Sequence, residues 1–491
     1  MLRFPFDNSY ARLPGGFYQR SAAATVSRPQ LVALNRSLAE ALGLDLADTD
    51  EAGLAEIFAG VQLPEGAQPL AMAYSGHQFG NFVPTLGDGR ALLLGEVIDA
   101  SGQRRDIQLK GAGRTPFSRG GDGLCPLGPG IREYLVSEAM HALGVPTTRA
   151  LALVTTGETA LREVAHPASV LTRVAASHVR VGTFQYFAAR DDRDNLERLA
   201  DYVIQRHYPE IEGSEAPYRD LLAAIAARQA VLIAHWMRLG FIHGVMNTDN
   251  MAVSGETIDY GPCAFMDEFR ADARFSFIDQ HGRYAYANQP ALAVWNLSRL
   301  AEAMLPLLHD DQDTAVTIAQ EVLEGFMPAY EKHWLDEMRR KLGLLDAHDD
   351  DGDLAYSLFE AMQANRVDFT LLFQRLSTVV DQPTEADAVR VLFGQPEDWD
   401  AWEARWRQRL DAETGDGEAR KQMMLVANPA VIPRNHLIER AIRAAEDDGD
   451  FAVFHRLREA LIRPFEVSPG DHDLIQPPEP GERVTQTFCG T

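Results

Sequence analysis

An apolar helix that leads into a short polar loop constrains this chain of 491 residues more than any other feature. Residues 217–239 are rich in Ala and Leu at helical spacing, and Gly240 follows them as a typical helix C-cap. The loop beyond carries Asp249 and Asn250, and an Asp259-Tyr-Gly turn comes after it. The sequence therefore predicts a buried helix that supports a polar loop, around which the rest of the chain is organised.

The spacing within this loop matches the catalytic loop of protein kinases. Kinases have a His, a base Asp two residues on, a metal-binding Asn five residues later, and a second metal-binding Asp in an Asp-Phe-Gly turn. Counted from His243, the metal positions fall on Asn250 and Asp259, whereas the base position falls on Val245. Valine cannot accept a proton, so the pattern keeps the metal site without the usual base. Asp249 is the only acid in the loop itself.

Upstream of the loop, glycines, strands and a lysine follow the order of a kinase N-lobe. Gly87-Asp-Gly-Arg90 comes directly before an apolar run at 91–98 that reads as a strand, and glycines there let backbone N–H groups approach phosphates. Taken alone, this pattern also fits a plain hairpin turn. A second strand, 104–110, ends at Lys110, and it is the only lysine in the first 331 residues. The chain has 42 arginines, so the presence of a lysine here indicates a role that needs a compact ammonium group. The alternative is that Lys110 occurs here by chance.

Several charged residues fit either a binding role or an ordinary one. Glu133 and Glu138 lie on the next expected helix, and either of them is able to pair with Lys110. Arg173 and Arg180 are seven residues apart and either point at phosphates or lie on the surface.

Charge and cysteine content narrow the class of protein. The net charge is 46 − 71 = −25, which disfavours nucleic acid and favours a protein or small-molecule partner. The three cysteines, Cys125, Cys263 and Cys489, form no CxxC pair, which is typical of a reducing compartment. No apolar run reaches the roughly 18 residues of a membrane span, and the first residues lack a secretory pattern. We expect a cytoplasmic monomer with no membrane and no nucleic-acid partner.

The expected fold is α+β and bilobal, with a protein-kinase-like (pseudokinase) arrangement of a β-containing N-lobe and a large helical C-terminal region. Helical patterns include a segment near 30–42 and two long ones at 314–340 and 354–378. The expected parts are an N-terminal extension (1–70), the N-lobe (71–180), a C-lobe with the catalytic loop and metal site (181–290), a helical C-terminal region (291–470) and a tail (471–491) that carries Cys489.

Four motifs are specific enough to indicate a family: Tyr74-Ser-Gly-His-Gln-Phe-Gly80, Gln108-Leu-Lys-Gly-Ala-Gly-Arg-Thr-Pro-Phe-Ser-Arg119, His243-Gly-Val-Met-Asn-Thr-Asp-Asn250 and Asp259-Tyr-Gly-Pro262. With these motifs the chain resembles the selenoprotein O family of protein adenylyltransferases, also called YdiU, over nearly its whole length. The resemblance implies a pseudokinase that binds ATP in an orientation inverted relative to active kinases. AMP would then be attached to a Ser, Thr or Tyr hydroxyl of a protein while pyrophosphate leaves, in a family associated with redox homeostasis.

The resemblance also implies roles for single residues. It implies nucleotide contacts at Gly87, Gly89, Arg90, Lys110, Asp122, Gly123, Arg173, Arg180 and Asp259, with Glu133 pairing Lys110. It places Mg²⁺ on Asn250 and Asp259 and makes Asp249 the candidate proton acceptor. Many eukaryotic members have selenocysteine near the C-terminus, where this chain has Cys489, and Cys263 is a candidate disulfide partner for it.

Three alternatives stay open at this point. The first is a nucleotidyltransferase that uses UTP with Mn²⁺, because nothing in the sequence identifies the base pocket. The second is a true kinase with Asp249 as the base, which the valine at 245 disfavours. The third is a non-catalytic ATP-binding scaffold, which the retained pair Asn250 and Asp259 disfavours. If the chain is a protein adenylyltransferase, redox proteins are its expected targets.

Overall fold

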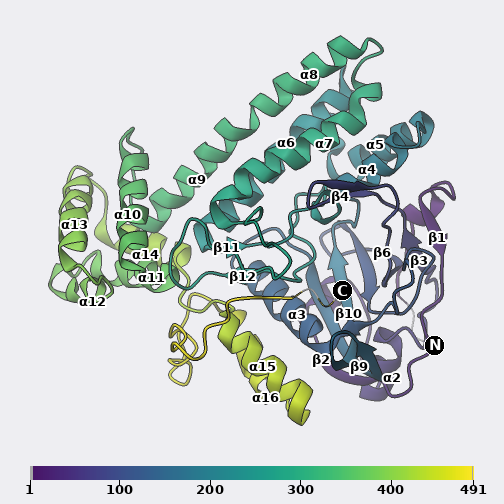
Figure 1. Cartoon of the computed structure of the whole chain (residues 1–491), viewed down its shortest axis with the longest axis horizontal. Coiled ribbons are helices and arrows are strands. Elements are labelled where there is room, and N and C mark those ends of the chain that lie inside the picture. Colours follow the sequence, from purple (N-terminus) through teal and green to yellow (C-terminus); the bar gives the residue numbers. More distant parts are fainter. Residues whose placement is uncertain (1–3, 489, 491) are drawn as a thin grey trace.

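The computed structural model describes residues 4–488 and 490. An antiparallel sheet occupies the N-terminal part, and helices make up most of the chain that follows (Figure 1). This confirms the predicted α+β class.

The main sheet holds the N-terminal part together. Its strands follow the order β1 (Tyr18–Arg20), β3 (Leu70–Met72), β6 (Ala91–Ile98), β7 (Arg104–Lys110), β10 (Ala165–Ala175), β9 (Arg149–Leu161) and β2 (Gln30–Leu34), and β8 (Cys125–Pro126) pairs with β10. The predicted strands at 91–98 and 104–110 are confirmed. Alternate residues of β6 enter two separate apolar clusters, Leu93 on one face and Leu92 and Leu94 on the other. Both faces are therefore covered.

Two helices cover the two faces of this sheet. Helix α3 (Leu127–Ala142) packs on β9 and β10 from one side, and α2 (Glu51–Phe58) packs on β2, β9 and β10 from the other. Apolar side chains of α3, such as Ile131 and Leu135, belong to the same cluster as Leu93, whereas Phe58 of α2 lies in the cluster with Leu92. This arrangement fixes α3, with Glu133, against the strand that carries Arg173.

Helix α6 (Pro217–Leu239) supports the polar loop, as the sequence predicted. It contacts α5 (Arg193–His207), which follows α4 (Val181–Ala188) in the chain, and ends at Gly240, whose φ of +67° is the left-handed C-cap conformation. Among the residues described, α6 is the one helix long and apolar enough to cross a membrane, but most of it is buried in the protein core. Strands β11 (Phe241–Ile242) and β12 (Ala264–Phe265) then pair and close the polar loop at its base.

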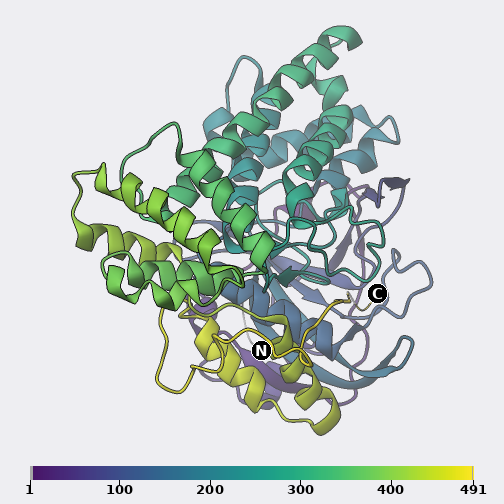
Figure 2. The ribbon, with the colours of Figure 1, turned by 60° about the vertical axis from the view of Figure 1, so that its left-hand side comes forward.

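The remaining helices form the C-terminal part (Figure 2). They are α7 (Gln289–Leu308), α8 (Gln312–Glu324), α9 (Phe326–Leu342), α10 (Asp351–Asn365), α11 (Phe369–Val379), α12 (Asp387–Arg390), α13 (Pro396–Asp411), α14 (Gly417–Ala427), α15 (Asn435–Asp448) and α16 (Ala452–Leu461). The last two return to the N-terminal part, where both pack on α3. The chain therefore closes back on the element that carries Glu133.

Three expected helices differ in the structure. The helix expected at 30–42 is wrong, because residues 30–34 form β2 against β9 and only α1 (Arg36–Ala41) is helical. Asn35 separates the two as an N-cap, with its side-chain oxygen accepting from the Leu38 N–H at 3.1 Å. The long helix at 314–340 breaks at Gly325, and the one at 354–378 breaks at Arg366, which has a φ of +55°.

Removal of the buried Arg434 guanidinium should destabilise the protein. Arg434 is fully buried before α15 and donates to Asp368 at 2.8 Å and to Asp267. In Arg434→Met two carboxylates lose their counter-charge, so we expect the free energy of unfolding to fall by about 3–5 kcal/mol, measured by urea denaturation. The exposed control Arg463→Met should change it by no more than about 0.5 kcal/mol. Equal urea midpoints for Arg434→Met and wild type would contradict this account.

Candidate active site

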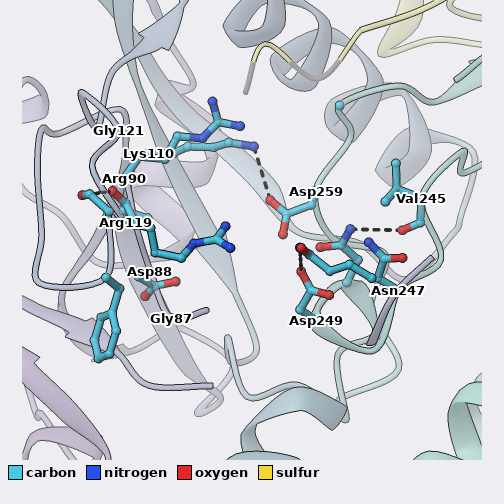
Figure 3. Close-up of a pocket in the computed structure, with 18 of the residues that line it drawn as sticks. Gly87, Asp88, Arg90, Lys110, Arg119, Gly121, Val245, Asn247, Asp249 and Asp259 are labelled. Atoms are coloured by element: carbon cyan, nitrogen blue, oxygen red, sulfur yellow. Dashed lines mark hydrogen bonds and ion pairs between the residues drawn. The ribbon is translucent and has the colours of Figure 1, made fainter. Parts of the chain in front are cut away.

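A cavity of 730 Å³ lies between the sheet and the polar loop that α6 supports. Figure 3 shows Lys110 and Arg90 reaching into it from the sheet side, opposite Asp249 and Asp259 from the loop side. Its lining includes Gly87, Gly89, Arg90, Lys110, Asp122, Gly123, Arg173, Arg180, Asp249, Asn250 and Asp259. The structure thus brings these sequence-predicted residues together from segments far apart in the chain. Glu133 lies beside the cavity, in contact with Lys110.

An ion cluster centred on Asp259 joins the two sides of the cavity. Its carboxylate lies 2.8 Å from Arg173, 2.9 Å from Arg180 and 3.3 Å from Lys110. Lys110 Nζ also lies 2.5 Å from Glu133 Oε2. The three cations and Glu133 are each at most 5% exposed, so these charges interact in a region that water hardly reaches.

Glu138 was the other sequence candidate for pairing with Lys110. It accepts instead from the Arg149 guanidinium at 2.7 Å and from the Asn35 side-chain amide at 2.7 Å. Glu133 and Glu138 lie five positions apart on α3, so they face different neighbours. Glu138 thus fastens α3 to β9 and to Asn35, which follows β2, away from the cavity.

The cluster keeps Asp259 ionised in an unusual backbone conformation. Burial alone would raise the pKa of Asp259, but the charges of Arg173, Lys110 and Arg180 outweigh it and hold that pKa well below its usual range. Asp259 has a φ of +63°, in the left-handed region that non-glycine residues rarely adopt. Such strain persists where surrounding contacts over-determine the conformation, as the three cations do here.

Asn250 and Asp259 offer the oxygen ligands that a divalent cation prefers. The Asn250 side chain donates its N–H to the Val245 carbonyl at 3.0 Å, which leaves the amide oxygen as the ligand atom. Carboxylate and amide oxygens suit Mg²⁺ and Mn²⁺. Over residues 4–488 and 490, no group of three or more His, Cys, Asp or Glu side chains is placed to hold a metal. A cation here would therefore take further ligands from nucleotide phosphates and water, as is usual for Mg²⁺.

Two glycines are required by close approaches, one between the Gly-rich turn and the loop at 111–123 and one within that loop. Gly87 has a φ of +64°, and a Cβ there would lie 2.3 Å from the Phe117 ring. Gly123 has a φ of +74°, and its Cβ would lie 2.1 Å from the Gly113 carbonyl carbon. Any side chain at either position would push the loop out of the cavity wall.

The cavity lining also contains cations that the sequence analysis did not single out. Arg114, Arg119 and Arg162 bring the lining to seven Lys or Arg against four Asp, in a chain of net charge −25. Arg114 and Arg119 belong to the polar Gly- and Arg-rich loop at 111–123, whose composition could have indicated them as cavity residues. Arg162 follows β9, and no sequence pattern around it indicates a place in the cavity wall. Its guanidinium donates to Asp122 at 2.7 Å.

The C-terminal tail contacts both sides of the cavity. The Gly490 carbonyl accepts from Arg90 and from Arg162, each at 3.0 Å. The Thr487 hydroxyl donates to the Pro262 carbonyl at 2.6 Å, next to the Asp259-Tyr-Gly turn. Cys489 comes between them in the sequence and lies outside the described residues, so the structure does not test Cys263 as its candidate disulfide partner.

Comparisons with known proteins identify the family. The family model described as "Protein adenylyltransferase SelO" matches residues 1–462. A protein of Rhizobium meliloti (strain 1021) is 57% identical over 491 residues, and one of Rhodopseudomonas palustris (strain BisB5) is 58% identical over 490, with 100% of each chain covered. Both relatives are named protein nucleotidyltransferase YdiU. The chain is thus similar to nucleotidyltransferases throughout. Within that class it belongs to the protein adenylyltransferase SelO family.

We predict that Cys263 is unreactive in the folded protein. Its side chain is fully buried, and burial raises the pKa of the thiol to about 12, so almost none of the nucleophilic thiolate forms at pH 8. Iodoacetamide at pH 8 should leave Cys263 unmodified in native protein and label it in urea, as measured by peptide mass spectrometry. A Cys263–Cys489 linked peptide from mildly oxidised native protein would contradict this prediction.

Proposed function

We propose that this chain is a protein adenylyltransferase with a kinase-like bilobal arrangement, which transfers AMP from ATP to a protein hydroxyl and releases pyrophosphate. The observation that carries the proposal is a contrast within one loop. The metal-ligand pair Asn250 and Asp259 and the Lys110–Glu133 ion pair line or adjoin the cavity, whereas Val245 fills the position of the kinase base. Such a site retains the means to hold a triphosphate, while the usual route to γ-phosphoryl transfer is absent.

The buried cations suit a triphosphate whose charge shifts during reaction. Lys110, Arg173 and Arg180 are held in place by Asp259 and Glu133 before any nucleotide arrives. Preorganised charges in a water-poor site stabilise negative charge that develops in the transition state, here on the departing pyrophosphate. A divalent cation on Asn250 and Asp259, which we take to be Mg²⁺ with ATP as the nucleotide, would supply additional positive charge to the phosphates.

We assign to Asp249 the role of accepting the proton of the acceptor hydroxyl. It lines the cavity and is 7% exposed. Burial raises the pKa of Asp249 to about 6, against the opposing influence of a hydrogen bond from Gln78 and the charge of Arg180. A carboxylate with a pKa near the working pH serves better as a general base than one at its ordinary value.

The family resemblance and the charge of the chain support a proposal for the targets of the enzyme and for the state in which it acts. We take the targets to be proteins, among them redox proteins, modified by a cytoplasmic monomer. The net charge of −25 disfavours nucleic acid as a substrate.

Position-specific labelling of ATP tests the reaction itself. With Mg²⁺ and ATP labelled at the α- or the γ-phosphate, we expect protein-bound label from the α position alone. Asp259→Ala should remove it, because the cluster loses the carboxylate that orders its three cations, while the control Asp310→Ala, with a side chain 89% exposed, should retain it. Protein-bound label from the γ position would instead support a kinase. ATP binding without any label would support a scaffold, and transfer from UTP with Mn²⁺ in preference to ATP would change the nucleotide assignment.

Charge stabilisation should matter more than the base. We expect Asp249→Ala to retain a measurable transfer rate, lowered by roughly 10²–10⁴-fold, whereas Asp259→Ala falls below detection. Chelation of divalent metal with EDTA should abolish transfer in wild type. Initial rates of AMP incorporation, together with calorimetry of ATP binding, measure both variants. An equal loss in the two variants would contradict this ranking.

A further inference from the structure

A small hairpin that the proposed mechanism has not used lies against the loop carrying Asp249. It consists of β4 (Gly76–Gln78) and β5 (Asn81–Val83), and its first strand and turn belong to the Tyr74–Gly80 motif of the sequence. Three successive hairpin residues each donate to one of the loop residues 247–249. The bonds are His77 N–H to Thr248 Oγ1 at 2.7 Å, Gln78 Nε2 to Asp249 Oδ2 at 3.1 Å and Phe79 N–H to Asn247 Oδ1 at 3.1 Å.

The hairpin encloses the Asp249 side chain. A Cβ on Gly76 would lie 2.6 Å from Asp249 Oδ1, 2.8 Å from Leu86 Cδ1 and 2.9 Å from Asp249 Cβ, so a glycine is needed for space, although its φ is ordinary. Asp249 Oδ1 is buried without a hydrogen-bond partner among the residues the structure describes. Within that same part of the chain, Gln78 is the side chain that donates to the other oxygen. The carboxylate is thus fixed by one donor and by the shape around it.

The hairpin is itself firmly held. The Gln185 side chain of α4 accepts from the Thr248 hydroxyl at 2.7 Å and bonds the His77 ring at 2.8 Å. The Phe79 ring packs edge-on against the Tyr284 ring, with 5.2 Å between centroids. Phe79 has a φ of +52°, a strained value for a non-glycine residue. A hairpin held by contacts on both sides of Gln78 can keep a partner side chain in one orientation.

We propose that Gln78 is a positioning residue for Asp249, and that position 76 must be glycine because Asp249, together with Leu86, occupies the space of any side chain there. The inference rests on the proposed function, in which Asp249 accepts a proton from the acceptor hydroxyl. Proton transfer depends strongly on the direction of the accepting oxygen, so a carboxylate free to rotate would meet the hydroxyl less often in a productive geometry. Gln78 acts through Asp249 and need not contact the nucleotide phosphates.

The side chain of Gln78 can be removed without disturbing the hairpin contacts. His77 and Phe79 bond the loop through backbone N–H groups, which a substitution at 78 leaves in place. Gln78→Leu keeps a similar volume and removes the donor. We expect kcat for AMP transfer to fall by roughly tenfold or more while KM for ATP changes by less than about twofold. The control Asn81→Ala, at an exposed position of the same hairpin, should leave both constants unchanged within twofold.

A double-mutant cycle separates positioning from a general structural effect. If Gln78 acts through Asp249, then Gln78→Leu should cause no further loss in the residual rate of Asp249→Ala. An equal loss in both backgrounds, or an unchanged kcat in Gln78→Leu alone, would overturn the inference. Full activity of Asp249→Ala would remove the proton acceptor from the proposed function, and this inference with it. Failure of the proposed function can thus be told apart from failure of this inference, because it appears in the single Asp249 variant.

Gly76→Ala provides a second test through a different contact. The added methyl group would overlap both the Asp249 carboxylate and the buried Leu86 side chain, so kcat should fall while calorimetric ATP affinity stays near wild type, and the overpacking should also lower the thermal unfolding midpoint. The matched control is Gly15→Ala, where a Cβ meets nothing within 4 Å and the φ is ordinary. Wild-type kcat in Gly76→Ala would overturn the claim that Asp249 requires glycine at 76.

Discussion

The architecture depends on the neutralisation of the Asp259 carboxylate by three buried cations. Lys110 ends β7, Arg173 lies on β10, and Arg180 precedes α4, so three separate elements converge on one side chain of the polar loop. The strand register explains part of this convergence. Lys110 pairs with Leu171 and Gln108 with Arg173, which places Lys110 and Arg173 as diagonal neighbours on one face of the sheet. Glu133 reaches the same place because α3 packs on that face.

The same cluster connects stability with chemistry. Buried charges cost several kcal/mol each unless they are paired, and each member here has at least one partner of opposite sign. The cavity lining nevertheless holds more cations than acids, so the binding of a polyanion would complete the neutralisation. The cations also stabilise the left-handed backbone of Asp259, a conformation that a non-glycine residue disfavours by itself. A site of this kind is arranged before the nucleotide binds.

The sequence predicted the parts of this site that local patterns encode. The strand at 91–98 is a short apolar run, the helix at 217–239 repeats with helical periodicity, and residue spacing indicated Lys110, Asn250 and Asp259. The strand at 30–34 was mistaken for a helix because its short apolar run fits both periods, and pairing with β9 decides between them. The choice of Glu133 over Glu138, and the contribution of Arg162, depend on tertiary packing that no local pattern encodes.

The polar loop is restrained by three separate sets of contacts, and these place the Asp249 carboxylate at the cavity although position 245 is valine. At its base the loop is closed by the β11–β12 pair, and on its other side the β4–β5 hairpin bonds residues 247–249. Arg180 adds a third restraint, because it donates to the Asp249 backbone carbonyl at 2.7 Å and also to Asp259. One arginine thus sets the distance between the candidate proton acceptor and the candidate metal ligand. The loop therefore presents a carboxylate to the cavity from position 249, because its geometry is imposed by its neighbours as well as by its own sequence.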